Sequence, residues 1–63
     1  MTIVEMRAKQ EELVAQARSL LADIKDDTKE DRVAELEAQH DKAMADFDKL
    51  DARIKREEAL EAR

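Results

Sequence analysis

Apolar side chains recur at alternating steps of three and four residues in two separate segments of this chain. That spacing is the heptad rhythm of helices that pack against one another along a single stripe. In the first segment Val14 and Leu21 widen the stripe on one side, and in the second Leu60 falls outside it. We call the two stripes together the seam: Ile3, Met6, Gln10, Leu13, Ala17, Leu20 and Ile24, then Val33, Leu36, His40, Ala43, Phe47, Leu50 and Ile54. All of these except Gln10, which interrupts the stripe, form the predicted helix–helix interface.

One polar patch, Asp26–Asp31, separates the two segments and contains no apolar residue. The pattern therefore predicts an all-α fold, with one helix over about 3–25, a loop over about 26–29 and a second helix over about 30–62, forming a single domain. Asp27 and Glu30 have the spacing of a capping box, and Thr28 is the alternative N-cap residue. Because the patch contains no glycine, one continuous long helix is the alternative architecture.

If the loop forms, the two stripes can meet in an antiparallel hairpin or coiled coil. The last eight or nine residues of the second helix would then project beyond the first. The register that matches the two stripes places Ile24 near Val33, Leu20 near Leu36, Ala17 near His40, Leu13 near Ala43 and Met44, Gln10 near Phe47, Met6 near Leu50, and Ile3 near Ile54.

The composition favours long helices and a small core. The chain has no Gly, Pro, Cys, Trp or Tyr, and 46% of its 63 residues are charged. The remainder is rich in residues that lose little conformational freedom in a helix. Chains of this length rarely build a sufficient core without disulfides, metals or partner subunits. We therefore expect the chain to form a homo-oligomer.

The charge distribution limits the classes of partner. The net charge is −5, and residues 26–52 contain ten acidic and four basic side chains. Because phosphate binding needs a cationic face, this balance argues against nucleic acid as a partner. No apolar run approaches the roughly 20 residues of a membrane span, and no signal peptide is recognisable. The sequence therefore predicts a soluble, intracellular chain without a membrane partner.

The candidate catalytic and metal-binding residues all have simpler structural interpretations. His40 lies on the seam, where a register-setting polar residue is favoured over a pH switch. Asp46, Asp48 and Asp51 resemble the start of a calcium loop but lack its glycine. Adjacent carboxylates such as Glu11 and Glu12 point apart on a helix and have no pocket to separate their pKa values. We therefore expect no enzyme activity, no metal and no cofactor.

Two further groups of residues indicate helix surfaces. Arg53, Lys55 and Arg56 alternate with acidic residues, which is typical of a solvated helix face; docking onto an acidic protein surface is the alternative. The first segment begins with apolar residues but lacks the aromatic anchors and lysine-rich face of membrane-surface helices. A partner helix is therefore the expected contact of this segment.

The residue strings on either side of the loop resemble a specific family. The string MRAKQEELVAQARSLLADIK (residues 6–25) and the string AELEAQHDKAMADFDKLDARIKREEALEAR (residues 34–63) resemble the delta domain, an N-terminal segment of the major capsid proteins of tailed bacteriophages. Unlike the usual family pattern, the loop here contains no glycine. The residues that carry the resemblance are Met6, Arg7, Glu12, Leu13, Ala17, Arg18, Leu20 and Leu21, then Phe47, Asp48, Leu50, Asp51, Ala52, Arg53, Ile54, Arg56 and Leu60.

The resemblance implies a scaffolding function. Delta domains gather on the inner face of the immature procapsid in the host cytoplasm, help to set its size, and are then removed by a maturation protease. The family segment precedes a shell-forming fold, so we expect this chain to be an isolated scaffold piece, a proteolytic product or a different coiled coil altogether. We add the hypothesis that the acidic stretch from Asp26 to Asp51 repels incoming DNA, so that its removal eases packaging. The alternative is a non-viral dimerising coiled coil from a regulator or adaptor.

Overall fold

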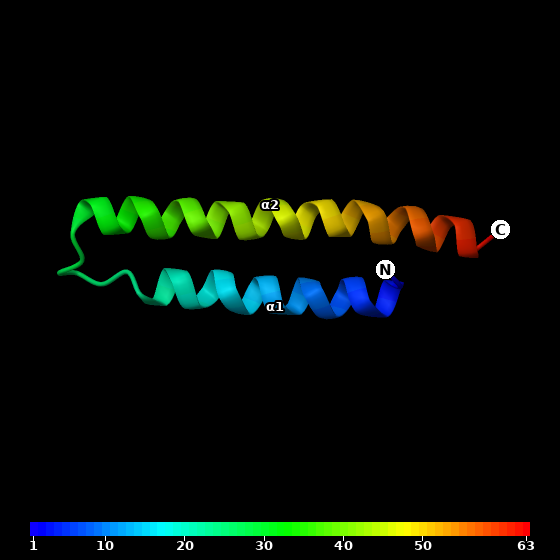
Figure 1. Cartoon of the computed structure of the whole chain (residues 1–63), viewed down its shortest axis with the longest axis horizontal. Coiled ribbons are helices and arrows are strands. Elements are labelled where there is room, and N and C mark those ends of the chain that lie inside the picture. The colour runs from blue at the N-terminus through cyan, green and yellow to red at the C-terminus, as the bar shows by residue number, and fades with distance from the viewer.

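The chain folds into two helices that lie side by side and run in opposite directions (Figure 1). The computed structural model describes all residues from Met1 to Arg63, with α1 spanning Ile3–Ala22, α2 spanning Glu30–Glu61, and no strand. The molecule measures 53 × 14 × 14 Å. The all-α prediction is confirmed and the chain is a helical hairpin, so the alternative of one continuous helix is wrong.

The loop begins earlier than the sequence pattern predicts. We expected the first helix to extend to about Lys25, but it ends at Ala22. The hydroxyl of Thr28 accepts a hydrogen bond from the Lys25 N–H at 2.8 Å, which removes that N–H from the helical ladder. No residue of the loop has a positive φ angle. The connection is therefore long enough to reverse the chain without the glycine that a tighter helix end requires.

The two helices begin differently. Thr2 accepts from the Glu5 N–H at 3.1 Å, and the Glu5 carboxylate accepts from the Thr2 N–H at 3.1 Å, which completes a capping box that we did not predict. The N-cap of α2 is Lys29, whose side chain makes no capping hydrogen bond. Both predicted caps, at Asp27 and at Thr28, are therefore wrong, because the Thr28 hydroxyl stabilises the loop instead.

All fourteen seam residues are buried or half-buried in the hairpin. Leu21, which we expected to widen the stripe, is 46% exposed, whereas Val14 is half-buried. Leu13, Ala17 and Ala43 form one buried cluster, against which Met44, Phe47 and Leu50 pack. Only seven residues of the chain are buried: Met6, Gln10, Leu13, Ala17, Leu36, Ala43 and Ile54.

Two of the predicted neighbours are observed across the seam. The Gln10 side-chain amide lies 3.3 Å from the Phe47 carbonyl oxygen, and Leu13 shares its buried cluster with Ala43. These pairs establish the antiparallel register near the middle of α1. The other five predicted pairs remain predictions.

Candidate interaction surface

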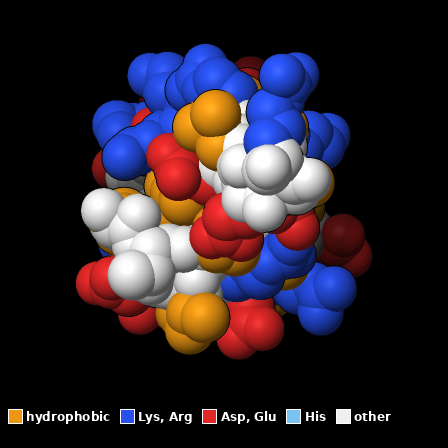
Figure 2. Space-filling view, turned by 90° about the vertical axis from the view of Figure 1, so that its right-hand side faces the viewer, with side chains coloured by type: hydrophobic (Ala, Val, Ile, Leu, Met, Phe, Trp, Pro, Cys, Tyr) orange, Lys and Arg blue, Asp and Glu red, His pale blue; other side chains and the backbone are white.

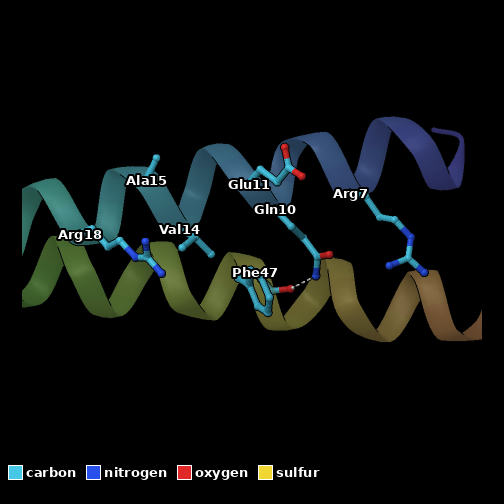
Figure 3. A pocket seen from close by; sticks show the side chains of 7 residues that line it. All are labelled: Arg7, Gln10, Glu11, Val14, Ala15, Arg18 and Phe47. Carbon is cyan, nitrogen blue, oxygen red and sulfur yellow. Dashed lines mark hydrogen bonds between the residues drawn. The ribbon is translucent and has the colours of Figure 1, made fainter.

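A shallow groove of about 660 Å³ runs along α1 and faces the middle of α2. Val14 and Phe47 contribute large apolar side chains to it, while Glu11 and Ala15 point away from α2 (Figure 3). Arg7, Gln10 and Arg18 complete the lining. The groove is therefore an open surface with an apolar floor and charged edges.

Gln10 is the one polar residue buried in the hairpin. Its Nε2 donates to the Phe47 carbonyl (Figure 3), and its side chain also contributes to lowering the pKa of the Asp51 carboxyl. No buried side-chain nitrogen or oxygen in the chain lacks a hydrogen-bond partner. The buried amide is therefore satisfied in the observed register, and removing its partner would leave an unpaired polar group inside the hairpin.

A regular pattern runs along α1 beside the groove, and we call it the outer face of α1; its Glu11 and Ala15 point away from α2, while Arg18 turns toward α2 (Figure 3). Val4, Glu11 and Arg18 recur every seven residues along it. Between them lie Ala8, Ala15 and Ala22, also at intervals of seven, and every one of these residues is exposed. Val4 is 78% exposed and Leu21, at the edge of this face, is 46% exposed. The outer face therefore combines uncovered apolar side chains with one acidic and one basic residue.

The last nine residues, 55–63, form an overhang in which no residue is buried. One contact links the overhang to α1, an ion pair in which Arg7 Nη2 lies 2.9 Å from Glu58 Oε2. Leu60 is 66% exposed beside a shallow hollow that Arg56, Ala59 and Arg63 also line. Seen end-on from the termini, the molecule shows many Lys and Arg side chains and only small, separate apolar patches (Figure 2).

The ionisable groups with shifted pKa values are held by short-range contacts. A hydrogen bond from the Lys55 ammonium, at 2.9 Å, lowers the pKa of the Asp51 carboxyl and raises that of Lys55. Hydrogen bonds from Thr2, first its backbone N–H and then its hydroxyl, lower the pKa of Glu5. The largest cause in each case is a contact within one helix or its cap, and Gln10 and Arg7 of α1 add a smaller lowering of the Asp51 pKa across the hairpin.

The other candidate residues also lie on helix surfaces. His40 is half-buried on the seam, and its Nδ1 lies 3.2 Å from the carboxylate of the neighbouring Asp41. Glu11 and Glu12 are both exposed. No cluster of three or more His, Cys, Asp or Glu residues has the arrangement of a metal site. Neither helix is long and apolar enough to span a membrane.

Comparisons with protein-family models, with curated proteins and with solved structures found no match for this chain. The resemblance to phage delta domains therefore stays a prediction. The outer face of α1 is the feature that our sequence analysis missed, because we followed only the seam. The signal that reveals it is the second seven-residue repeat, in which Ala8, Ala15 and Ala22 alternate with Val4, Glu11 and Arg18.

Proposed function

We propose that this chain is a helical module that self-associates and so holds copies of a protein together in a larger assembly. The observation that carries the proposal is the small core: seven of 63 residues are buried, and the two helices share a single seam. Domains of this size bury a small fraction of their surface and are marginally stable alone. A second copy would supply the burial that the hairpin lacks.

The distribution of exposed apolar side chains supports the same function. Met1, Val4 and Leu21 are exposed on or beside α1, while α2 exposes a single large apolar side chain, Leu60. Val4 and Leu21 lie 17 residues apart, about 25 Å along the helix, so each would form a small, separate contact with another chain. Weak contacts of this kind become effective when many copies are held close together.

Sedimentation equilibrium combined with circular dichroism over a range of concentrations tests this function. If association stabilises the fold, molar mass and helical content rise together as concentration increases. A fully helical monomer at millimolar concentration would contradict self-association. A monomer that lacks helix at low concentration and gains it with association would support it most directly.

The biological setting that we propose is the internal scaffold of a phage procapsid. In this setting the hairpin is part of a major capsid protein, contacts copies of itself on the inner face of the immature shell, and is later removed by a maturation protease. The resemblance of residues 6–25 and 34–63 to delta domains supports this assignment. The small core supports it as well, because a helix pair with few buried contacts opens readily for proteolysis.

The coding sequence that follows Arg63 in the parent gene distinguishes this setting from others. A β-rich shell-forming domain of a few hundred residues would support the capsid scaffold. A DNA-binding or enzymatic domain would contradict it and would favour the coiled coil of a regulator or adaptor. Either result leaves self-association to be decided by the sedimentation experiment.

A further inference from the structure

We infer that the partner of the outer face of α1 is the same face of a second copy, packed antiparallel about a two-fold axis between Val14 and Ala15. This inference rests on the proposed self-association and names the surface that would carry it. In this arrangement Glu11 of each copy faces Arg18 of the other. The interface is isologous, the commonest form among homo-oligomers.

The charges of the outer face make it complementary to itself. Glu11 and Arg18 lie seven residues apart, about 10 Å along the helix axis. Neither makes an ion pair within the chain, although Arg7 and Lys9 on the same helix both do. Antiparallel pairing about the proposed axis places each of these unpaired charges opposite its counterpart. Two opposite-charge contacts therefore form at once, by symmetry.

The apolar residues of the face fit the same register. Ala8 of one copy lies opposite Leu21 of the other, and Val14 lies opposite Ala15. Because alanine leaves the helix surface low, two helices can approach closely along such a stripe. The exposed side chain of Leu21 would then be covered by the second copy. The groove along Val14 lies at the centre of this contact, where the second α1 can fill it.

The corresponding face of α2 is less suited to pairing with itself. There Ala38, Ala45 and Ala52 alternate with Asp41 and Asp48, and all five residues are exposed. Antiparallel pairing about an axis between Met44 and Ala45 sets Asp41 opposite Asp48, which is a contact between like charges. A register that sets Asp48 opposite Lys55 joins opposite charges, but Lys55 already pairs with Asp51 of its own helix at 2.9 Å. Because Glu11 and Arg18 have no such partner within the chain, α1 is the better surface for a two-fold dimer.

The main rival arrangement packs α1 of one copy against the outer face of α2 of another. It also matches charges, because Arg18 can face Asp48 and Glu11 can face Lys55. This pairing joins two different surfaces, whereas the proposed dimer uses one surface twice. The two arrangements therefore differ in their sensitivity to substitution of Asp48.

Charge reversal tests the inference on the full chain. Glu11→Arg and Arg18→Glu each create two like-charge contacts in the proposed dimer, so each should raise the dimer Kd on the order of tenfold or more at low salt. An equimolar mixture of the two variants should restore dimers, because every contact across the heterodimer again joins opposite charges. The double variant, which exchanges the two charges, should also dimerise like the original chain. Asp48→Lys is the matched control and should leave the dimer Kd within roughly threefold of the original.

Sedimentation equilibrium at fixed low ionic strength measures each case, and circular dichroism confirms that the exposed substitutions leave the helices intact. A mixture that associates no better than its components would overturn the antiparallel α1 pairing, as would single variants that dimerise like the original chain. Loss of association by Asp48→Lys would assign the contact to α1 and α2 instead. If the original chain stays monomeric, the proposed function fails before the choice of surface arises.

Discussion

The two ends of the hairpin are stabilised by different means. At the loop end the chain itself joins the helices, yet Leu20, Ile24 and Val33 are only half-buried, and Leu36 is the one seam residue there with 1% exposure. At the open end no covalent link exists, but Met6 is 1% exposed and Ile54 is 2% exposed, while Ile3, the first residue of α1, is half-buried. At this end α2 continues past the start of α1, whereas nothing projects beyond the loop. Closeness to the covalent turn therefore does not by itself bury a seam residue.

Truncation of one seam residue at each end gives the largest expected effects. Met6→Ala, which truncates a side chain with 1% exposure at the open end, should lower the free energy of unfolding by about 2–5 kcal/mol. Leu20→Ala, near the loop, should cost roughly half as much because less of its side chain leaves water on folding. Urea unfolding followed by circular dichroism, at one fixed protein concentration, measures both. An equal or greater loss for Leu20→Ala would refute the contrast between the ends.

Substitutions at the two helix caps should change the free energy of unfolding by intermediate amounts, lowering it at the cap of α1 and raising it at the cap of α2. Thr2→Ala removes the capping box of α1 and should cost about 1 kcal/mol, while Thr2→Ser should be nearly neutral. Lys29→Ser offers α2 the cap that it lacks and should add up to about 1 kcal/mol. Thermal melts of the three variants measure these changes. A destabilising Lys29→Ser would show that the loop geometry excludes a side-chain cap.

The ion pair between Arg7 and Glu58 should contribute less, because both side chains are about half exposed. A double-mutant cycle with Arg7→Ala and Glu58→Ala should give a coupling free energy of about 0.2–1 kcal/mol, decreasing with added salt. The cycle tests whether this ion pair ties the overhang to α1. Zero coupling at low salt would show that it does not.

The smallest expected effect concerns pH. The hydrogen bond from Lys55 lowers the pKa of Asp51 in the folded chain, so its stabilisation is complete above the unfolded value near 3.9 and is lost as pH falls through the folded value. The raised pKa of Lys55 acts oppositely: its contribution is present below about 10.4 and is lost as pH rises through the folded value. Asp51→Asn should therefore flatten the acid side of the stability curve.

The matched control for this titration is Asp26→Asn at the loop end. Asp26 is exposed and makes no ion pair or side-chain hydrogen bond, so its substitution should leave the acid side of the curve as steep as before. Urea unfolding between pH 2 and 6 provides the comparison. If both substitutions flatten the curve equally, a general charge effect rather than the Asp51–Lys55 contact governs acid stability.

The two helices and the seam between them could be predicted because the spacing of apolar residues repeats along each segment. The end of α1 and the cap of α2 could not be predicted in this way. Asp27 and Thr28 both have the side chains of N-cap residues, yet the Thr28 hydroxyl accepts from the Lys25 N–H. The N-cap residue of α2 is instead Lys29, whose side chain makes no capping hydrogen bond. The extent of Leu21 exposure also depends on how α2 is rotated about its axis, which the spacing does not specify. The residues of the outer face of α1 form a second seven-residue repeat in the sequence, but their exposure is known only from the fold.

A rod 14 Å thick has consequences for how its sequence can evolve. Almost every side chain touches water, so a position outside the seam needs only to tolerate a helix, and many residue types do. Substitutions can therefore accumulate quickly while the hairpin persists, provided that the three-and-four rhythm is kept. Homologues of such a chain would share the spacing of apolar residues more than residue identities. Homology among them is therefore better sought in that spacing than in a sequence alignment.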